Sequence, residues 1–327
     1  MMISSHFPSR NELSVCFAHV AYRMADAFAR RNTGLKHRDV RSLDDLERCA
    51  GDAHVIVASS LWRNELLDRA KNVRFVQSIS AGTDQYDKER FRQMGVRLAS
   101  AQGVNANAVA EHAIALILAL ARQLHSGRDN QRAKIWRGMA ADPEAREDEL
   151  SGKTLLIVGL GGIGARLATL AKAFELRVIA VKRNPNFGAS AADAIHPASE
   201  LPRLLPLADI VALTCPLTPE TENLMDARAL GLMKPSAYLV NVARGRVVDE
   251  QALVAALQDG TIAAAGIDCT REEPLPAASP LWSLRNVLLT PHTAGETRRY
   301  EDGVIDLLLD NLERLWRGET VLRNQIV

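Results

Sequence analysis

The sequence contains few of the residues that cross-link a fold or hold a structural metal. Only four cysteines occur among the 327 residues, and no two of them form a Cys-x-x-Cys pair. The four are Cys16, Cys49, Cys215 and Cys269. Such wide spacing suggests neither a disulfide framework nor a zinc site, so we predict no metal. A chain of this length buries roughly three-quarters of its unfolded surface, which makes such cross-links unnecessary.

Long apolar runs and an excess of one charge are also absent. The longest apolar run, residues 113–121, has nine residues, whereas a membrane-spanning helix needs about 20. The first residues show no basic region followed by an apolar stretch, so we expect no signal peptide and a cytoplasmic location. Forty Lys and Arg against 39 Asp and Glu leave a net charge of +1, which favours neither nucleic acid nor a membrane as a partner.

What the sequence does have is a regular alternation of short apolar runs with longer amphipathic segments. This pattern is typical of strand–helix–strand units in a mostly parallel sheet. At roughly 150 residues per domain, the length also favours two domains. We therefore predict an α/β fold of two doubly wound domains.

Two series of strands can be placed along the chain. The first series has strands at residues 13–18, 53–58, 73–79 and 96–99, with helices at 21–31, 64–71 and 87–94. The second series has strands at residues 154–159, 177–181, 210–214, 237–242, 263–267 and 287–290.

Three segments lie outside these series. Asn105 and Asn107 can cap a helix that continues to about residue 121 and is apolar on most faces. Residues 122–150 are rich in charge, and they fit either a solvated helix and loop or an arm that contacts another subunit. Residues 297–318 have apolar side chains at helical spacing. We expect this last helix to return to the first domain, with a cleft between the domains.

A glycine-rich segment follows the strand that begins the second series. Gly159, Gly161 and Gly164 fit the pattern Gly-x-Gly-x-x-Gly, with Gly162 and Ile163 between them. A strand before this pattern and a helix after it make it a dinucleotide-binding fingerprint. The first turn of the helix then offers its N–H groups to a pyrophosphate.

The next strand ends in two cations where NAD-dependent enzymes place an acid. Lys182 and Arg183 stand about 20 residues after the glycine pattern, and no acid follows before Asp193. Two cations suit the 2′-phosphate of NADP(H), which a carboxylate would repel. We therefore favour NADP(H) over NAD(H); a solvated strand end is the alternative.

Three later strands of the second series also end in polar residues. They lead to Arg244, to a group of acidic residues after residue 267, and to His292. Open α/β sheets bind ligands at this edge. An Arg can hold a carboxylate and polarise the neighbouring carbonyl, and a His kept protonated by a Glu can donate a proton. The reduction of a 2-oxo acid needs this set of side chains.

Seven motifs follow one another along the chain. They are Ser80-Ala-Gly-Thr-Asp84, Gly103-Val-Asn-Ala-Asn-Ala-Val-Ala-Glu111, Gly159-Leu-Gly-Gly-Ile-Gly164, Pro216-Leu-Thr-Pro-Glu-Thr221, Asn241-Val-Ala-Arg-Gly-Arg246, Glu273-Pro-Leu-Pro276 and Thr290-Pro-His-Thr-Ala-Gly295. In their order and spacing, the sequence resembles the D-isomer-specific 2-hydroxyacid dehydrogenases over nearly its whole length.

This resemblance implies roles for individual residues. Arg244 would bind the substrate, Glu273 would tune His292, and His292 would donate the proton. Ser80, Ala81 and Gly82 would bind the substrate together with Arg244 and His292. The residues that would line the nicotinamide half of the cofactor are Cys215, Pro216, Thr221, Val242, Ala243, Asp268, His292, Ala294 and Gly295.

The resemblance also implies a domain plan and an assembly. A flavodoxin-like substrate domain would contain residues 1–102 and 293–327, with a Rossmann cofactor domain, residues 103–292, inserted in it. The family forms homodimers largely through its cofactor domains, so we expect a homodimer here.

Some residues depart from the family pattern or allow two interpretations. Cys269 and Thr270 stand where many members have Val and Phe. Trp62 is either a wall of the substrate pocket or a core or surface aromatic. His112 and His125 lie outside the catalytic motifs, and we interpret them as packing or solvent-facing residues.

The hypothesis from sequence is a reductase of small 2-oxo acids that yields D-2-hydroxy acids. The loops after Ser59 and Ser80 have few aromatic residues and no second cation that could bind a carboxylate, which suggests a small substrate such as glyoxylate or hydroxypyruvate. Two alternatives stay open: a phosphite-type dehydrogenase of the same superfamily, and a non-enzymatic NAD(P)H-sensing protein like the C-terminal-binding corepressors. Formate oxidation is disfavoured because formate dehydrogenases pair their His with Gln.

Overall fold

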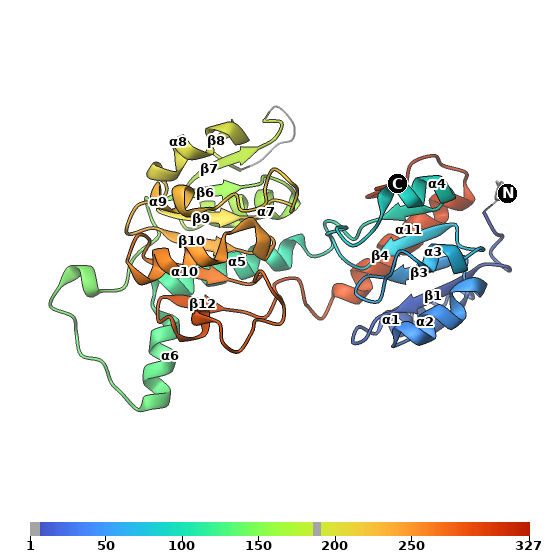
Figure 1. Cartoon of the computed structure of the whole chain (residues 1–327), viewed down its shortest axis with the longest axis horizontal. Helices are drawn as coiled ribbons and strands as arrows, with labels where there is room; N and C mark the ends of the chain where they lie inside the picture. The colour runs from blue at the N-terminus through green and yellow to red at the C-terminus, as the bar shows by residue number, and fades with distance from the viewer. Residues whose placement is uncertain (1–6, 186–190) are drawn as a thin grey trace. The chain divides into compact units, whose positions relative to one another are not determined.

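Residues 7–185 and 191–327 are described by the structure, a computed structural model. They form two compact units, each built from alternating strands and helices (Figure 1). Unit 1 contains the described residues up to Asn105 together with Thr297–Val327, and unit 2 contains Ala106–Glu296. The expected domain changes at 102/103 and 292/293 therefore lie three or four residues before the changes between these units.

Unit 1 has a five-stranded parallel sheet in the order β2-β1-β3-β4-β5, which is the flavodoxin-like order. Its strands are β1 Ser14–Ala18, β2 Lys36–Val40, β3 Val55–Ala58, β4 Phe75–Ser78 and β5 Arg97–Ala99. Its helices are α1 Met24–Ala29, α2 Leu43–Cys49, α3 Leu66–Arg69, α4 Lys88–Met94 and α11 Tyr300–Trp316.

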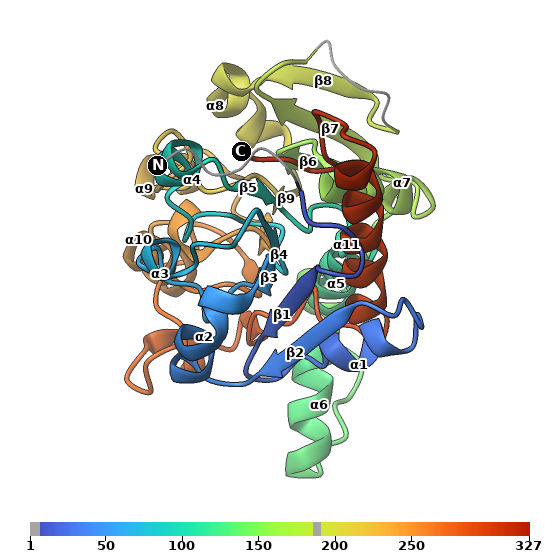
Figure 2. The same cartoon turned by 90° about the vertical axis from the view of Figure 1, so that its right-hand side faces the viewer.

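Helices cover both faces of this sheet, with α1 and α11 on one face and α2, α3 and α4 on the other (Figure 2). The central strand β3 is buried and apolar on both faces for this reason. The C-terminal helix α11 packs beside α1, as its apolar spacing predicted. Its Tyr300 hydroxyl donates a hydrogen bond to the carbonyl of Ile79. The last residues of the chain thus complete the core of unit 1.

Unit 2 has a seven-stranded parallel sheet in the order β12-β11-β10-β9-β6-β7-β8. Counted from β6, this is the Rossmann order with one further strand, and the predicted fold class is confirmed. Its strands are β6 Thr154–Val158, β7 Arg177–Lys182, β8 Ala194–Pro197, β9 Ile210–Leu213, β10 Tyr238–Asn241, β11 Ala264–Ile267 and β12 Val287–Leu289.

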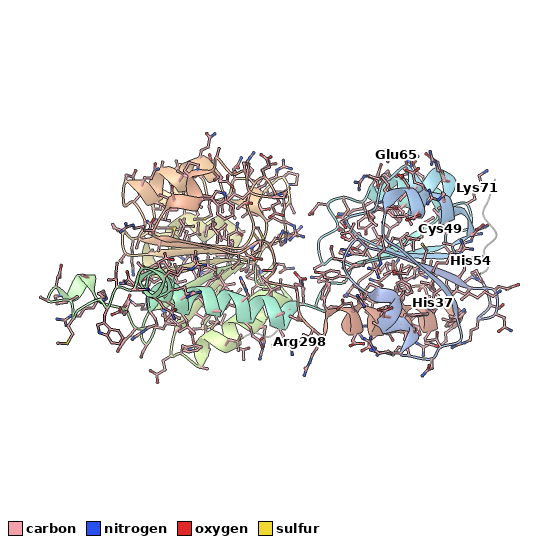
Figure 3. All side chains as sticks on the ribbon, turned by 90° about the horizontal axis from the view of Figure 1, so that it is seen from below. His37, Cys49, His54, Glu65, Lys71 and Arg298 are labelled. Atoms are coloured by element: carbon pink, nitrogen blue, oxygen red, sulfur yellow. The ribbon has the colours of Figure 1, made fainter. Side chains whose placement is uncertain are left out.

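Helices also cover both faces of the sheet in unit 2. They are α5 Ala106–Ala121, α6 Leu124–Ala133, α7 Gly162–Lys172, α8 Leu201–Leu204, α9 Ala227–Gly231 and α10 Glu250–Gln258. Helix α5 lies beside α7 and against β10 and β11 (Figure 3), which explains why it is apolar on most faces. Short 3-10 turns occur at Ala50–Asp52, Pro143–Ala145, Ala198–Glu200, Leu205–Leu207, Gly245–Val247 and Pro280–Ser283.

Two strands were missed by the sequence analysis, and both are edge strands. Strand β2 has four exposed residues out of five, and β8 is half-buried throughout. An edge strand can carry charge because only one of its sides is paired and its faces are partly solvated. Neither segment therefore shows the apolar run that marks the central strands.

The segment between α5 and β6 extends away from the sheet of unit 2 (Figure 1). Helix α6 has no buried residue. In the loop after it, the side chains of Trp136 and Met139 are fully exposed. Both interpretations of this segment, a solvated arm and a subunit contact, stay open on these facts. Among the described residues, no helix has the length and apolar character needed to cross a membrane.

Shortening a buried side chain of α11 should destabilise the protein. Leu308 is fully buried, so Leu308→Ala removes apolar contacts and leaves a cavity, at a cost of about 2–5 kcal/mol in the free energy of unfolding. Urea denaturation followed by circular dichroism measures this loss. Val321→Ala, at a site 66% exposed in the same unit, should change the free energy by less than about 0.5 kcal/mol. Equal stability of both variants would contradict the packing described.

Candidate active site

The glycine loop of unit 2 is packed so tightly that two of its glycines cannot be replaced. Gly159 adopts a φ of +104°, and a Cβ there would lie 2.6 Å from the Cα of Cys215. A Cβ on Gly164 would lie 2.4 Å from the carbonyl of Gly159. These two glycines therefore let α7 and the loop after β9 approach β6 closely.

The other two glycines of the loop are less tightly packed. A Cβ on Gly161 would meet nothing within 4 Å, and one on Gly162 would be 3.8 Å from Ala106. Gly161 is the N-cap of α7, and no side chain caps the N-terminus of this helix. The loop thus combines a helix N-terminus with room for a ligand, and these residues fit the pyrophosphate of a dinucleotide. Ile163, in the first turn of α7, is half-buried.

The two cations after β7 lie at the carboxyl edge of the sheet. Lys182 is half-buried and Arg183 is exposed. Asp193, the first acid to follow in the chain, accepts hydrogen bonds from Lys172 Nζ at 2.9 Å and from the Val178 N–H at 2.7 Å. Its carboxylate is therefore engaged at the other end of β7.

The loop after β9 is held by one hydroxyl. Thr221 Oγ1 accepts from the N–H of Thr218 at 2.8 Å and donates to the carbonyl of Pro216 at 2.7 Å. The backbone of Cys215 lies against Gly159, and its side chain is only 8% exposed. In the structure, Thr221 folds this loop and Cys215 packs it against the glycine loop.

The loop after β10 carries Arg244 and is held by hydrogen bonds to Asn241 and by a close contact with the loop at Thr270. Asn241 accepts from the N–H of Ala243 and donates to the carbonyl of Arg244, both at 3.0 Å. Arg244 Nη1 donates to the carbonyl of Ala243 at 2.8 Å. Gly245 lies so close to the next loop that a Cβ would be 1.9 Å from the carbonyl oxygen of Thr270. Val242 and Ala243 are buried at the end of the strand.

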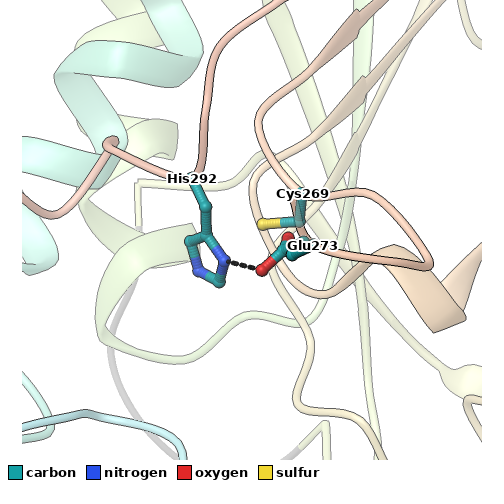
Figure 4. A group of neighbouring side chains, drawn as sticks. All are labelled: Cys269, Glu273 and His292. Atoms are coloured by element: carbon teal, nitrogen blue, oxygen red, sulfur yellow. Dashed lines mark hydrogen bonds and ion pairs between the residues drawn. The ribbon is translucent and has the colours of Figure 1, made fainter. Parts of the chain in front are cut away.

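Glu273 and His292 form the central pair of the site. Glu273 Oε2 lies 2.7 Å from His292 Nδ1, and each side chain is about 40% exposed (Figure 4). Glu273 Oε1 also accepts from the N–H of Thr270 at 3.1 Å. Burial would raise the pKa of Glu273, but the hydrogen bond and charge of His292, the Thr270 N–H and the charge of Arg244 outweigh it and lower that pKa. Glu273 and His292 therefore meet at one edge of the sheet, and Arg244 follows a neighbouring strand at the same edge.

Asp268 shapes the turn that carries His292. This carboxylate is 2% exposed and accepts hydrogen bonds from Thr290 Oγ1 at 2.6 Å, from the Thr293 N–H at 3.0 Å and from the Ala294 N–H at 3.2 Å. The backbone N–H of His292 also binds the carbonyl of Asp268 at 2.8 Å. With these bonds in place, His292 adopts a left-handed φ of +55°, which few residues adopt unsupported.

His112 extends this network and was missed by the sequence analysis. Its Nε2 lies 2.9 Å from Thr290 Oγ1. The Thr290 hydroxyl donates its only proton to Asp268, so its oxygen accepts a hydrogen bond from His112 Nε2. We expected His112 to be a packing or solvent-facing residue; it is half-buried, and its contact with Thr290 was not part of that expectation. No signal along the chain pairs it with Thr290, which lies 178 residues away.

The remaining predicted residues lie in the turn after His292, in unit 2, and in the loop after β4, in unit 1. Ala294 is buried in the turn after His292, and Gly295 follows it. Ser80, Ala81 and Gly82 lie in unit 1, just after β4, where the hydroxyls of Ser80 and Ser59 are hydrogen-bonded. Trp62 is 2% exposed and packs against Tyr86 and Phe91, so it is a core aromatic.

Most of unit 2 matches a known protein family. Residues 114–294, more than half of the chain, match the family described as "D-isomer specific 2-hydroxyacid dehydrogenase, NAD binding domain". The chain belongs to this family. The matched residues contain the glycine loop, Arg244, Glu273 and His292. The protein is thus an NAD(P)-dependent dehydrogenase of 2-hydroxy acids, and the resemblance drawn from the motifs is confirmed.

Relatives of this dehydrogenase span most of its length. Glyoxylate reductase from Pyrococcus furiosus is 37% identical over 84% of this chain and 83% of its own. Glyoxylate/hydroxypyruvate reductase B from Yersinia pestis is 38% identical over 80% of this chain and 79% of its own. The structure also resembles that of the NADPH-dependent glyoxylate/hydroxypyruvate reductase from Sinorhizobium meliloti, solved with NADP and malonate. The TM-score is 0.80 and the identity 27%, over 97% of both chains.

Adding one methyl group at Gly245 should disturb the dehydrogenase. To reach the 3.0 Å that real Cβ atoms keep, the Thr270 backbone must move by about 1 Å relative to Gly245. Because Arg244 and Glu273 flank this contact, Gly245→Ala should lower kcat/KM at least tenfold and cost about 1–3 kcal/mol of stability. Enzyme kinetics and thermal unfolding measure the two effects. Gly231→Ala, where a Cβ meets nothing within 4 Å, is the control and should match the wild type.

Proposed function

We propose that this dehydrogenase reduces a small 2-oxo acid to the D-2-hydroxy acid, with His292 as the proton donor. The observation that carries the proposal is the 2.7 Å contact between Glu273 Oε2 and His292 Nδ1, with Arg244 close enough to lower the pKa of the same carboxyl. Carbonyl reduction requires a proton donor, a group that orients this donor, and a positive charge for the developing alkoxide. His292, Glu273 and Arg244 are the proposed residues for these three roles.

The pairing determines which atom of His292 donates. Nδ1 is engaged with Glu273, so Nε2 is the ring atom that gives its proton to the alkoxide oxygen formed at C2 of the substrate. Glu273 fixes the orientation of the ring and stabilises its positive charge before the transfer. Asp268 contributes indirectly, because it holds the turn in which His292 lies.

Arg244 is the proposed anchor of the substrate. Its guanidinium can bind a carboxylate through two parallel hydrogen bonds and polarise the adjacent carbonyl oxygen. The contact between Gly245 and the loop at Thr270 fixes where this side chain begins. Ser80, Ala81 and Gly82 are proposed to bind the substrate as well; their position after the carboxyl end of β4 supports this role.

NADPH is the proposed cofactor, and when bound it supplies the hydride. The glycine loop would bind its pyrophosphate, and Lys182 and Arg183 would bind its 2′-phosphate. The remaining residues of the nicotinamide side would be Cys215, Pro216, Thr221, Val242, Ala243, Asp268, Ala294 and Gly295. The engagement of Asp193 with Lys172 and the Val178 N–H, at the far end of β7, supports this choice, because its carboxylate is then held away from Lys182 and Arg183.

Glyoxylate and hydroxypyruvate are the substrates that we propose first. The relatives from P. furiosus and Y. pestis are named for these acids. We also propose a homodimer formed through unit 2. The exposed Leu124, Ile135, Trp136 and Met139 support it, because so many large apolar side chains on one segment indicate a protein interface.

Removing the imidazole should stop turnover and leave cofactor binding intact. His292→Ala should lower kcat for glyoxylate reduction by about 10²–10⁴-fold, because general acid catalysis contributes that much. NADPH binding, followed by its fluorescence, should stay within about threefold of the wild type. His125→Ala, a histidine on α6, is the control and should behave as the wild type. Undiminished turnover in His292→Ala would remove this residue as the proton donor.

Removing the two cations should change the choice of cofactor. In the double variant Lys182→Ala/Arg183→Ala, KM for NADPH should rise at least tenfold, because each hydrogen bond to a charged phosphate contributes about 1.5–3 kcal/mol. KM for NADH should change by less than threefold, since NADH lacks the phosphate. Initial rates at varied cofactor concentration give both constants. Arg177→Ala, at the opposite end of β7, is the control; a proportional loss with both cofactors would count against the proposal.

A further inference from the structure

A third ligand-type atom lies beside the Glu273–His292 pair. The Sγ of Cys269, a carboxylate oxygen of Glu273 and a ring nitrogen of His292 all lie within 4.8 Å of one another. Figure 4 shows the sulfur directed toward the two other side chains. Cys269 is 2% exposed, whereas Glu273 and His292 are both partly open to solvent. The sulfur thus forms the floor of a small cluster that is open on one side.

Sulfur, imidazole nitrogen and carboxylate oxygen are the atoms with which proteins bind zinc. Zinc bonds of about 2.0–2.3 Å in a tetrahedron place neighbouring ligand atoms about 3.3–3.8 Å apart. The longest of the three separations therefore needs to shrink by only about 1 Å, whereas Nδ1 of His292 and Oε2 of Glu273, 2.7 Å apart, must separate by about 0.6 Å to admit the ion. With three protein ligands, the fourth zinc position falls to a water molecule on the open side.

The loops that carry these atoms are already held in place. Cys269 and Glu273 lie on one loop, and the turn of His292 is bonded to Asp268, the residue before Cys269. Glu273 and His292 are each about 40% exposed, so packing does not prevent a side-chain adjustment once bonds to the ion replace the hydrogen bond between them. Zinc binding thus needs side-chain adjustment and no change of fold.

We propose that Cys269, Glu273 and His292 bind Zn²⁺, and that the bound ion reversibly inhibits the dehydrogenase. On binding, the Cys269 thiol and Nδ1 of His292 each release one proton to solvent, and Zn²⁺ takes the place of the proton between Nδ1 and the Glu273 carboxylate. With zinc on Nδ1, the ring can no longer take the doubly protonated form that donates from Nε2. The inhibition rests on the proposed function, whereas the binding does not.

Zinc binding is measured first without substrate. Wild-type protein, Cys269→Val and Cys49→Ala are freed of metal and titrated with ZnCl₂ by calorimetry, and with CoCl₂ by absorption spectroscopy. We expect one equivalent of zinc on the wild type and a thiolate-to-cobalt charge-transfer band, both kept in Cys49→Ala. Cys49 is a buried thiol of unit 1 (Figure 3) and controls for binding at other cysteines.

Loss of the sulfur should abolish this behaviour. In Cys269→Val the affinity for zinc should fall at least tenfold and the charge-transfer band should disappear, while thermal unfolding shows that the variant is folded. Identical zinc affinity and cobalt spectra in Cys269→Val and the wild type would overturn the proposed site.

Inhibition is measured second, with glyoxylate and NADPH. Zinc should inhibit the wild type, chelation by EDTA should restore turnover, and the zinc concentration for half-inhibition should rise at least tenfold in Cys269→Val. Zinc that binds through Cys269 and leaves turnover unchanged would refute the inhibition. If the protein reduces no 2-oxo acid, the proposed function fails, yet the metal titrations still decide whether the site exists.

Discussion

The geometry of the Glu273–His292 pair depends on one buried carboxylate, that of Asp268. Three hydrogen-bond donors from residues 290–294 converge on it, and its own backbone carbonyl binds the N–H of His292. A buried carboxylate is costly unless its oxygens are satisfied, so the turn and the carboxylate stabilise each other. The left-handed backbone of His292 is held within this set of bonds, and the imidazole therefore starts from a fixed position.

Close backbone contacts at three glycines also fix the loops around this turn. Gly159, Gly164 and Gly245 each allow two backbone segments to approach more closely than any side chain would permit. The approaches join β6 to the loop after β9, α7 to β6, and the loop of Arg244 to that of Glu273. Side chains of the site thus begin from backbone segments that are locked to one another, which is how a site at the end of a sheet can be preorganised.

Much of this arrangement could be predicted because it is local or repeats a strong pattern. The central strands are apolar on both faces, and the glycine loop lies between a strand and a helix, so both are readable from neighbouring residues. Arg244, Glu273 and His292 each follow a predicted strand, and parallel strands bring their ends to one edge. Strands β2 and β8 were not predictable in this way, because at the edge of a sheet the apolar pattern fades. The contact of His112 with Thr290 could not be predicted either, since it depends on how α5 crosses the sheet and not on spacing along the chain.

The return of α11 to unit 1 affects the order in which the two units can fold during synthesis. Unit 2 is one continuous stretch, Ala106–Glu296, whereas unit 1 lacks part of its core until Thr297–Val327 have been added. On the ribosome, the five-stranded sheet has one face incompletely covered while almost 200 further residues are synthesised. Domains that are contiguous can fold as they emerge. Synthesis therefore favours completion of the nucleotide-binding unit first, and unit 1 can close only after Thr297–Val327 have left the ribosome.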